Sequence, residues 1–210
     1  MRFTDKGASP AEFEAWKDLA TEDWEPSFEQ LQNPQKRILH QALIREQGGV
    51  CCYCGRAINL DNSHVEHFRP QESYRELALN FGNLHASCYR MPAPEATHCG
   101  HYKGNRFDEA LHISPLDPGC EQRFIYTAMG AIAPVMANDE NASFMVQLLG
   151  LNAQFLRDGR EAVLSVLDDG FLDTASAAEL NELCTALLQG EPDGDNSYAH
   201  VLARFIDQYR

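Results

Sequence analysis

The sequence predicts an α+β protein that is mostly helical, with a small metal-stabilised centre flanked by N-terminal and C-terminal helices. Apolar residues recur at helical spacing before residue 50 and again after residue 140. Short segments that alternate apolar and polar residues, as strands do, are confined to the stretch between them. Within that stretch, residues 51–106 hold five of the seven cysteines and five of the eight histidines. Sulfur and imidazole ligands gathered in one quarter of the chain indicate a metal centre.

Length and composition limit the class of protein. A chain of 210 residues, of which 44% are hydrophobic, is one domain or one domain with an appended lobe, and it can bury a core. No stretch approaches the roughly 20 apolar residues that a membrane span needs, and the first residues contain no apolar run. We therefore expect a cytoplasmic protein without a membrane partner. In that reducing compartment, cysteines are more often metal ligands than members of disulfides.

Charge is distributed unevenly along the chain. The net charge of −14 is unusual for a protein that grips nucleic acid alone, because phosphate contacts need lysine and arginine. Residues 51–106 contain six basic and five acidic side chains, whereas residues 136–210 contain four basic and thirteen acidic ones. The middle of the chain can therefore tolerate a polyanion, which the acidic C-terminal part would repel. Acidic helices there are either ordinary solvated faces or a docking surface for a basic partner.

Residues 1–50 are expected to form an N-terminal helical segment. One helix is predicted over 9–20 and another over 34–47, because each begins at a proline that follows a capping residue. The second should end at a pair of glycines. The side chains expected to face inward are Phe13, Trp16 and Leu19 in the first helix and Ile38, Leu39, Ala42 and Leu43 in the second.

Residues 107–210 are expected to form a hairpin followed by an acidic helical lobe. A turn at Met129-Gly130 lies between two short apolar segments, which predicts the hairpin. The later apolar spacing predicts helices from about 143, over 152–168 with an end at Gly170, over 176–189 and over 198–209, with an acidic loop at 190–196. We expect this lobe to dock a partner.

The first half of the metal centre lies at Cys51 and Cys54. Two intervening residues allow both sulfurs to turn to one side and share a tetrahedral metal. A redox pair of the thioredoxin type is the rival interpretation, but it needs a βαβ pattern that the sequence lacks. Cys52 lies between the two ligands and should face away from the metal.

The second half of the metal centre is expected at Cys88 and Cys99, on either side of an inserted loop at 91–94. We favour four thiolates around a structural zinc. Two alternatives remain. His98 can replace Cys99 as the fourth ligand, since imidazole also suits zinc, or Cys88 and Cys99 are ordinary buried cysteines.

Residues 64–70 combine three ionisable side chains on one predicted strand. Glu66 can hold a hard divalent cation through oxygen, and His67 can take a proton from water near neutral pH. Neighbours on an ideal strand point to opposite faces, which raises a geometric difficulty for this pair. Either the strand is distorted here, or His64 and Glu66 form the pair that shares a face. A lone histidine on a strand is more often structural.

A short helix is expected after Cys99. His101 and Asn105 lie four residues apart and would share one helical face, so either can supply a second ligand to a metal held by Glu66. Lys103 and Arg106 are placed to meet phosphate. The alternative is a plain surface turn, because glycines at positions 100 and 104 make a weak helix.

The order of these motifs resembles that of the HNH endonucleases. It runs Cys-x-x-Cys, then Glu-His with proline three residues on, then Asn-Leu, then Cys, then Cys-Gly-His-x-Lys-Gly. The resemblance is most specific to the HNH subunit, PtuB, of Septu-type and retron-associated anti-phage systems, in which the last cysteine is likewise displaced by an insertion. It covers roughly residues 34–106. The implied fold is a ββα-metal core, here residues 51–106, with two strands and a helix around one catalytic metal.

The resemblance also implies roles for single residues. His67 falls at the general base, Glu66 at the acidic metal ligand, and Asn83 at the asparagine that braces the loop. The helical metal ligand falls at His101 or Asn105, with His64 and Lys103 as additional site residues. Many members have asparagine directly after the last cysteine, where this chain has Gly100. The structural zinc positions fall on Cys51, Cys54, Cys88 and Cys99.

The implied activity is metal-dependent hydrolysis of phosphodiester bonds in DNA or RNA, with Mg²⁺ or Mn²⁺ as catalytic ion. The resemblance further implies that the chain is the effector of an anti-phage defence complex with an ATPase partner of the PtuA type. A catalytically inactive, zinc-stabilised binding or adaptor module is the alternative. Glu66 and His67 favour the nuclease, whereas Gly100 and the net charge favour the adaptor.

Overall fold

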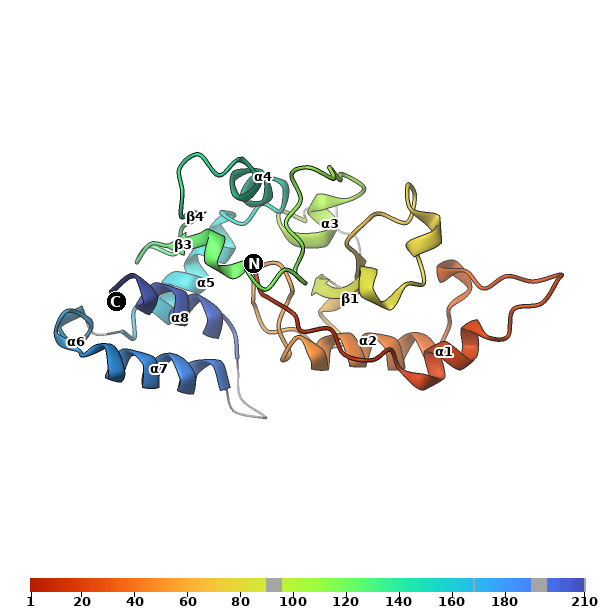
Figure 1. The fold of residues 1–210 in the computed structure, drawn as a ribbon, viewed down its shortest axis with the longest axis horizontal. Coiled ribbons are helices and arrows are strands. Elements are labelled where there is room, and N and C mark those ends of the chain that lie inside the picture. Colours follow the sequence, from red (N-terminus) through yellow and green to blue (C-terminus); the bar gives the residue numbers. More distant parts are fainter. Residues whose placement is uncertain (90–95, 168, 190–195, 210) are drawn as a thin grey trace.

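The structure, a computed structural model, describes residues 1–89, 96–167, 169–189 and 196–209 (Figure 1). These residues form a mixed, mostly helical fold with two small antiparallel sheets. The expected inserted loop at 91–94 and nearly all of the expected acidic loop at 190–196 lie outside the described residues. Figure 1 shows α1 toward one end of the molecule and α6 and α7 at the other, with α2, β1 and α3 in the middle.

The N-terminal segment holds α1 (Ala11–Lys17) and α2 (Gln35–Glu46). Helix α2 begins after the proline and ends at the two glycines, which both have positive φ, as predicted. Helix α1 is shorter than predicted, so the expected inward position of Leu19 is wrong. That side chain is 61% exposed because the helix ends two residues before it.

The centre of the fold is a ββα unit. Strand β1 (Ser63–His67) pairs antiparallel with β2 (Leu84–Cys88), and α3 (Cys99–Lys103) packs against β2. Helix α2 packs against both strands. The buried amide of Gln47, just after α2, accepts a hydrogen bond from the Ala86 N–H and donates one to the Ala86 carbonyl. Because buried amides need partners, this clamp fixes the helix on the hairpin that carries the site.

The C-terminal part confirms the predicted hairpin and most of the predicted helices. The expectation that Gly170 ends a helix is wrong, because this residue lies inside a short helix. Leu172 of that helix is buried, and its burial offsets the poor helix propensity of glycine. The helix expected from Ser176 begins at a capping box, in which Ser176 and Glu179 bond to each other's backbone N–H. The elements are β3 (Phe124–Tyr126), β4 (Ile132–Pro134), α4 (Glu140–Leu148), α5 (Gln154–Leu164), α6 (Asp169–Thr174), α7 (Ala177–Gln189) and α8 (Ala199–Ile206). The short 3₁₀ helices are η1 (Phe28–Gln30), η2 (Arg75–Leu77), η3 (Phe81–Asn83), η4 (Glu121–Arg123) and η5 (Asp207–Tyr209).

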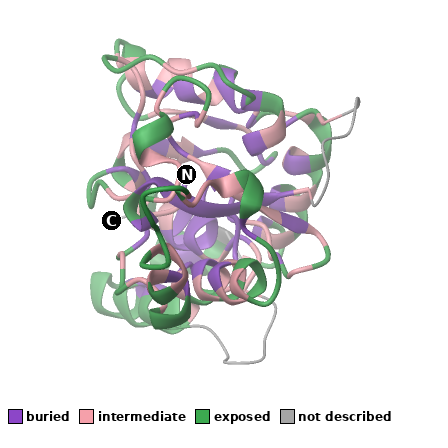
Figure 2. Cartoon of the chain, turned by 90° about the vertical axis from the view of Figure 1, so that its right-hand side faces the viewer, coloured by how far each residue is buried: buried purple, intermediate pink, exposed green. Residues whose placement is uncertain are grey.

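A single hydrophobic cluster joins the centre to the C-terminal helices, and the buried residues concentrate in the middle of the molecule (Figure 2). The Tyr198 N–H donates to the Gly55 carbonyl at 2.8 Å, and the Ala57 N–H donates to Ser197 Oγ at 2.7 Å. The Cys99 N–H donates to the Leu149 carbonyl at 2.8 Å. The C-terminal helices therefore complete the packing around the cysteine-bearing loop, so function is better tested by point substitution than by truncation.

Candidate metal centre and nuclease site

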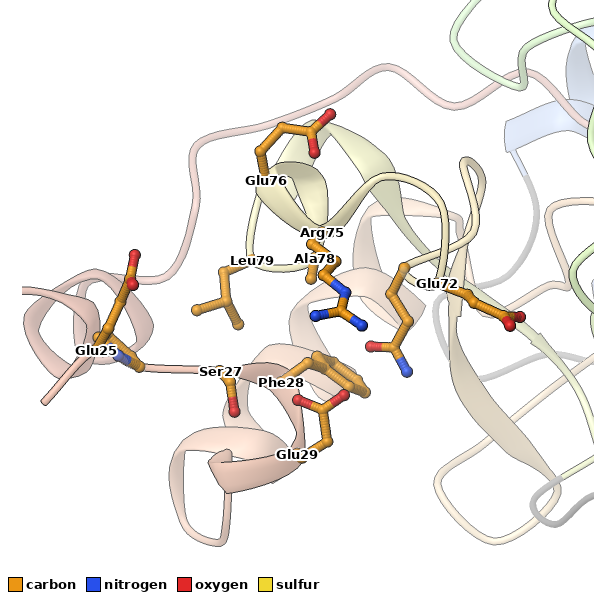
Figure 3. Close-up of a pocket in the computed structure, with 11 residues that line it drawn as sticks. Glu25, Ser27, Phe28, Glu29, Glu72, Arg75, Glu76, Ala78 and Leu79 are labelled. Carbon is orange, nitrogen blue, oxygen red and sulfur yellow. The ribbon is translucent and has the colours of Figure 1, made fainter.

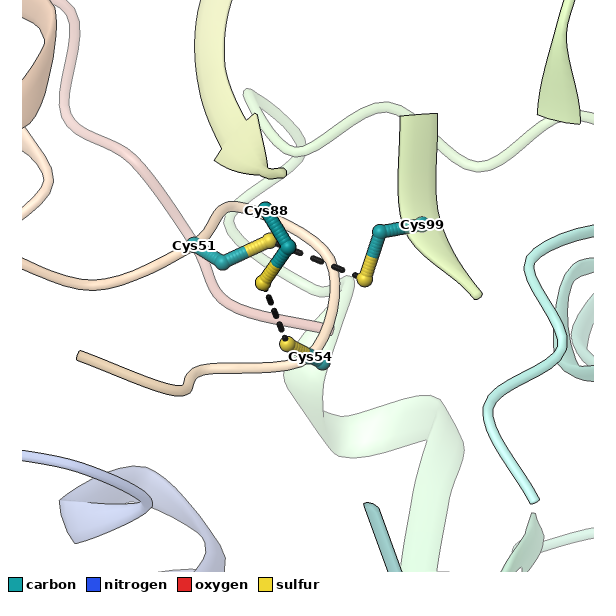
Figure 4. Close-up of side chains that lie close together, drawn as sticks. All are labelled: Cys51, Cys54, Cys88 and Cys99. Atoms are coloured by element: carbon teal, nitrogen blue, oxygen red, sulfur yellow. Dashed lines mark hydrogen bonds between the residues drawn. The ribbon is translucent and has the colours of Figure 1, made fainter. Parts of the chain in front are cut away.

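The four cysteines predicted to share a metal come together in the structure (Figure 4). Their Sγ atoms all lie within 4.8 Å of one another, and all four residues are buried. Cys54 and Cys88 are 3.4 Å apart and Cys51 and Cys99 are 3.8 Å apart, measured between sulfurs. A tetrahedral zinc with bonds of about 2.3 Å needs sulfurs about 3.8 Å apart. The cluster could therefore hold a structural zinc ion.

The four cysteines come from three local features of the fold. Cys51 and Cys54 lie on the loop after α2, where Gly55 has a φ of 73° and faces the His200 ring so closely that a Cβ would be 1.9 Å from it. Cys88 ends β2 and Cys99 opens α3. Local backbone geometry and the strand pairing thus bring together sulfurs that are distant in sequence.

His98 and Cys52, the two other residues considered at the cysteine centre, can also be located in the structure. The ring Nδ1 of His98 lies 3.0 Å from Cys99 Sγ, so the histidine lies beside the cysteine, which itself belongs to the sulfur cluster. Cys52 is buried but outside the cluster, as expected from its position between two ligands. Burial raises the pKa of the Cys52 thiol well above its usual value, which keeps it protonated.

Glu66 is a buried carboxylate whose two oxygens already have partners. Its Oε1 lies 2.9 Å from Lys103 Nζ and accepts a hydrogen bond from the Tyr53 hydroxyl at 3.1 Å. Its Oε2 lies 3.2 Å from His64 Nε2. Burial alone would raise the pKa of this carboxyl, but the Lys103 ammonium and the His64 ring hold it at about 2. Glu66 is therefore fully ionised at neutral pH.

His64 and Glu66 share one face of β1, which was one of the two sequence alternatives. His64 Nδ1 bonds to the Tyr89 carbonyl at 2.7 Å, and its ring stacks on His101 with centroids 3.8 Å apart. Burial lowers the pKa of His64, but bonding to Glu66 outweighs this effect and raises it. One carboxylate and two imidazoles thus lie together where β1 meets α3.

His67 lies on the opposite face of β1 from Glu66. Its Nε2 is 3.0 Å from the Ala78 carbonyl, which can only accept, so we assign the ring proton to Nε2. Nδ1 then carries the lone pair. Burial is the main reason that the pKa of His67 lies below its usual value, which favours the neutral ring. The ring also meets Phe28 edge-on, with centroids 4.5 Å apart.

Asn83 fastens the loop between the two strands. Its Oδ1 accepts from the Arg69 N–H at 2.8 Å, and its Nδ2 donates to the carbonyls of Arg69 and Leu77 at 3.0 and 3.2 Å. Its own carbonyl accepts from the Phe68 N–H at 2.9 Å. The side chain is 5% exposed, so these bonds are shielded from water. They hold the backbone that directly follows His67.

The end of α3 differs from the sequence prediction. Gly104, with a φ of 56°, ends the helix before Asn105, which therefore does not share a helical face with His101 and bonds to Glu72 instead. Lys103 is only 2% exposed, because it pairs with Glu66 and donates to the His67 carbonyl at 3.0 Å. The expectation that Lys103 meets phosphate is thus wrong for this arrangement. Arg106 stays exposed but donates to the carbonyls of its own neighbourhood.

Gly100 explains how Glu66 fits beneath α3. A Cβ at this position would lie 2.3 Å from Glu66 Oε2 and 2.9 Å from His64 Nε2. The missing side chain therefore creates the space in which the carboxylate and imidazole meet. Sequence reasoning missed Tyr53, the buried tyrosine that bonds Glu66, because nothing in a Cys-Cys-Tyr-Cys turn indicates a carboxylate partner.

The donor set at Glu66 suits a hard or borderline divalent ion, since a carboxylate favours Mg²⁺ or Mn²⁺ and imidazole extends the range to softer metals. Three of the roughly four lone-pair directions on the carboxylate are in use, two on Oε1 and one on Oε2, which leaves one on Oε2. Among the described residues, however, only the four cysteines bring three or more such ligand atoms within 4.8 Å of one another. The Glu66 site fits a metal chemically but is not assembled around one.

A ββα unit with a glutamate-histidine pair on its first strand, backed by a four-cysteine cluster, is consistent with the HNH class of endonucleases. No family model matches the chain. It is, however, 29% identical over 129 residues to a protein of Vibrio cholerae serotype O1 biovar El Tor described as the candidate HNH endonuclease of retron Vc95. It is also 31% identical over 86 residues to the Septu protein PtuB of Bacillus thuringiensis.

These matches cover 58% and 38% of the chain and 61% and 34% of the two relatives, so the chain spans less than two thirds of either. The resemblance to HNH endonucleases of the defence type, which the motif order predicts, is confirmed by both. Within the described residues, no helix is long and apolar enough to cross a membrane.

Proposed function

We propose that the protein is a metal-dependent HNH endonuclease that hydrolyses phosphodiester bonds in nucleic acid. The observation that supports this most strongly is the state of His67. Its Nε2 is held by the Ala78 carbonyl, and burial lowers its pKa, so Nδ1 is available to accept a proton. An oriented, neutral imidazole is what general-base catalysis near neutral pH requires.

In the proposed reaction, His67 Nδ1 removes a proton from a water molecule as the water oxygen attacks phosphorus in line with the leaving oxygen. Because His67 and Glu66 point to opposite faces of β1, the scissile phosphate would have to lie at the edge of that strand, within reach of both side chains. The bond from phosphorus to the leaving oxygen breaks and the leaving alkoxide takes a proton from solvent, while protonated His67 returns its proton to solvent. Asn83 keeps the following backbone fixed, which holds the ring in position. Glu66, with His64 and His101, would hold Mg²⁺ or Mn²⁺. This ion, when bound, would polarise the phosphate and neutralise the leaving oxygen.

We further propose that the four cysteines hold zinc as a structural ion. The cluster lies at the junction of the α2 loop, β2 and α3, and the C-terminal helices pack around it. Metal binding to such ligands is folding free energy, because the unfolded chain has no preformed site. The zinc would therefore fix the hairpin that carries Glu66 and His67 without taking part in hydrolysis.

The proposal includes a partner subunit, an ATPase as the resemblance to Septu implies. The chain carries a net charge of −14, with thirteen of its 31 acidic residues after position 135. Such a chain releases few counterions from nucleic acid on its own, so a partner should supply basic surface. Pull-down of the chain with its genomic neighbour at low and high salt tests this. Efficient cleavage by the chain alone at physiological salt would contradict it.

One observation favours the alternative function, a zinc-stabilised adaptor without activity. The Glu66 carboxylate is neutralised by Lys103 and bonded by Tyr53 and His64, so no net negative charge remains to attract a cation. Added Mg²⁺ or Mn²⁺ separates the two functions, because an adaptor would give no cleavage with either ion, whether or not the partner is present.

The experiment that tests the nuclease is His67→Ala in the full chain, assayed with the partner on DNA and RNA. Cleavage should be lost, while zinc content and melting temperature stay close to those of the wild type, since the ring makes one hydrogen bond and is no expected zinc ligand. His112→Ala is a matched control, because it removes another half-buried ring bonded to a backbone carbonyl. Unchanged cleavage in His67→Ala would reject this residue as the base.

A further inference from the structure

Two grooves of opposite charge meet at Phe28, the residue whose ring contacts His67. One lies between the segment around η1 and the loop carrying η2, with a volume of about 800 Å³, and we call it the acidic groove. The other lies between the start of α2 and the outer edge of β1, with a volume of about 570 Å³, and we call it the α2 groove. Both therefore reach the neighbourhood of the proposed general base.

The acidic groove does not suit a nucleic-acid backbone. Four glutamates line it against a single arginine, Arg75, whose side chain extends into the groove on the side of Phe28 (Figure 3). The glutamates are Glu25, Glu29, Glu72 and Glu76. Phosphates entering here would meet an excess of like charge, which costs binding energy at every contact.

The α2 groove has the opposite balance. Lys36 and Arg37 line it from the first turn of α2, where the helix dipole adds positive potential, and both are exposed. Lys36 Nζ lies over the Phe28 ring, 5.3 Å from its centroid, and neither cation takes part in the ion pairs found among the described residues. Among the described residues that line the groove, Asp61 is the single carboxylate. On a chain of charge −14, this groove is a basic surface.

The α2 groove also leads to the candidate site. His64 and His101, the stacked pair beside Glu66, line its far side. The groove includes residues of β1, whose second edge has no partner strand in the part of the chain that the structure describes. The floor is fixed, because His40 of α2 lies within hydrogen-bond distance of Ser63 of β1, at 2.9 Å. A strand lying in this groove would therefore pass the imidazoles with its phosphates facing two cations.

We propose that the α2 groove binds the sugar-phosphate backbone of the substrate strand through Lys36 and Arg37, which act as positioning residues. The link to cleavage rests on the proposed nuclease function, whereas binding of the strand does not. The groove's volume of about 570 Å³ is larger than a single phosphate needs, which favours a segment of a strand over an isolated phosphate.

The test is binding of fluorescent single-stranded DNA, single-stranded RNA and duplex DNA to the full chain at low ionic strength, without added divalent metal. In Lys36→Ala/Arg37→Ala, the slope of log affinity against log salt should become shallower by about 1.4 for a single strand, or about 1.8 for a duplex. The control, Lys17→Ala/Arg45→Ala, also removes two cations from the first helices but none from the groove, and it should bind like the wild type. Lys36, Arg37 and Arg45 are exposed, and Lys17 is half-buried and paired with Glu14, so the melting temperature should stay close to the wild-type value in the first double variant and fall only slightly in the control.

Several results would overturn the proposal: equal loss of binding in the two doubles, no loss in the groove double, no binding by the wild type, or a mononucleotide that binds as tightly as the strand. The cleavage assay keeps this proposal separate from the nuclease function. If the chain with its partner cleaves, the groove double should raise KM and leave kcat nearly unchanged. If no cleavage is seen but Lys36→Ala/Arg37→Ala still loses binding, the proposed nuclease function is rejected and the proposed binding groove is retained.

Discussion

The cysteine cluster and the Glu66 site lie on the same ββα unit but differ in how ready they are to hold a metal. Four buried sulfurs already have the spacing of a tetrahedral zinc site. Glu66, by contrast, is bonded to Lys103, Tyr53 and His64, and these bonds satisfy its charge without any ion. The difference separates a cluster that could take a metal ion as it stands from a carboxylate that would have to give up a partner before binding one.

The existing partners of Glu66 affect how tightly a metal ion could bind there. A divalent ion at Glu66 must replace part of a buried ion pair, in which both charges have already lost their water. Binding there should therefore be weaker and more easily reversed than binding at the sulfurs. For the proposed nuclease, activity would then depend on substrate phosphates or a partner completing the coordination.

The largest expected effect is at the cysteine cluster. Cys54→Ser should release the zinc and destabilise the whole chain by several kcal/mol, since metal binding there is folding free energy and one hydrophobic cluster spans the molecule. Metal content and thermal unfolding measure this. Cys52→Ala is the matched control and should keep one zinc per chain, because Cys52 lies outside the cluster. Equal zinc loss in both variants would reject the assignment of the ligands.

The second largest loss of stability is expected at the buried ion pair of Lys103 and Glu66. Lys103→Met should lower the free energy of unfolding by about 3 to 5 kcal/mol, because it leaves the Glu66 carboxylate buried without its cation. Chemical denaturation of this variant, of Glu66→Gln and of the double variant gives the coupling energy. The double should recover part of the loss. If the losses of the two single variants simply add up in the double variant, the two side chains do not depend on each other. The view that Lys103 already satisfies the charge of Glu66 would then be wrong.

The smallest effect is at Gly100. Gly100→Ala should cost about 1 to 3 kcal/mol, because the new methyl group meets Glu66 and His64, although alanine is the better helix former. Gly7→Ala, where the nearest atom is 4.0 Å from the added Cβ, should change stability little. A Gly100→Ala protein as stable as the wild type would show that the carboxylate has room to move, as a pre-opened metal site would allow.

Local patterns in the sequence were enough to predict several of these features. The proline and glycine signals bounded α2, and the turn at Gly130 located the second hairpin, because both depend on a few adjacent residues. The metal-ligand spacing predicted that Cys51 and Cys54 would meet Cys88 and Cys99. In each case the chemistry allowed few alternatives.

The charge balance of the Glu66 site could not be predicted in the same way. Lys103 is recognised as a partner of Glu66 only when β1 and α3 are placed side by side, and its sequence position suggested a surface contact. The alternation of faces on β1 indicated the pairing of His64 with Glu66 but not the burial that lowers the pKa of His67. Such features depend on packing between elements distant in sequence.

The most direct test of the proposal that the cysteine cluster binds its metal more tightly than the Glu66 site is a metal titration. It uses the wild-type chain together with its partner. After dialysis against a weak chelator, we expect one zinc per chain and no cleavage. Adding Mg²⁺ or Mn²⁺ should restore cleavage in the wild type and not in His67→Ala, with the zinc content unchanged. Cleavage by the zinc-loaded protein that does not respond to either ion, or no cleavage under any of these conditions, would contradict the account.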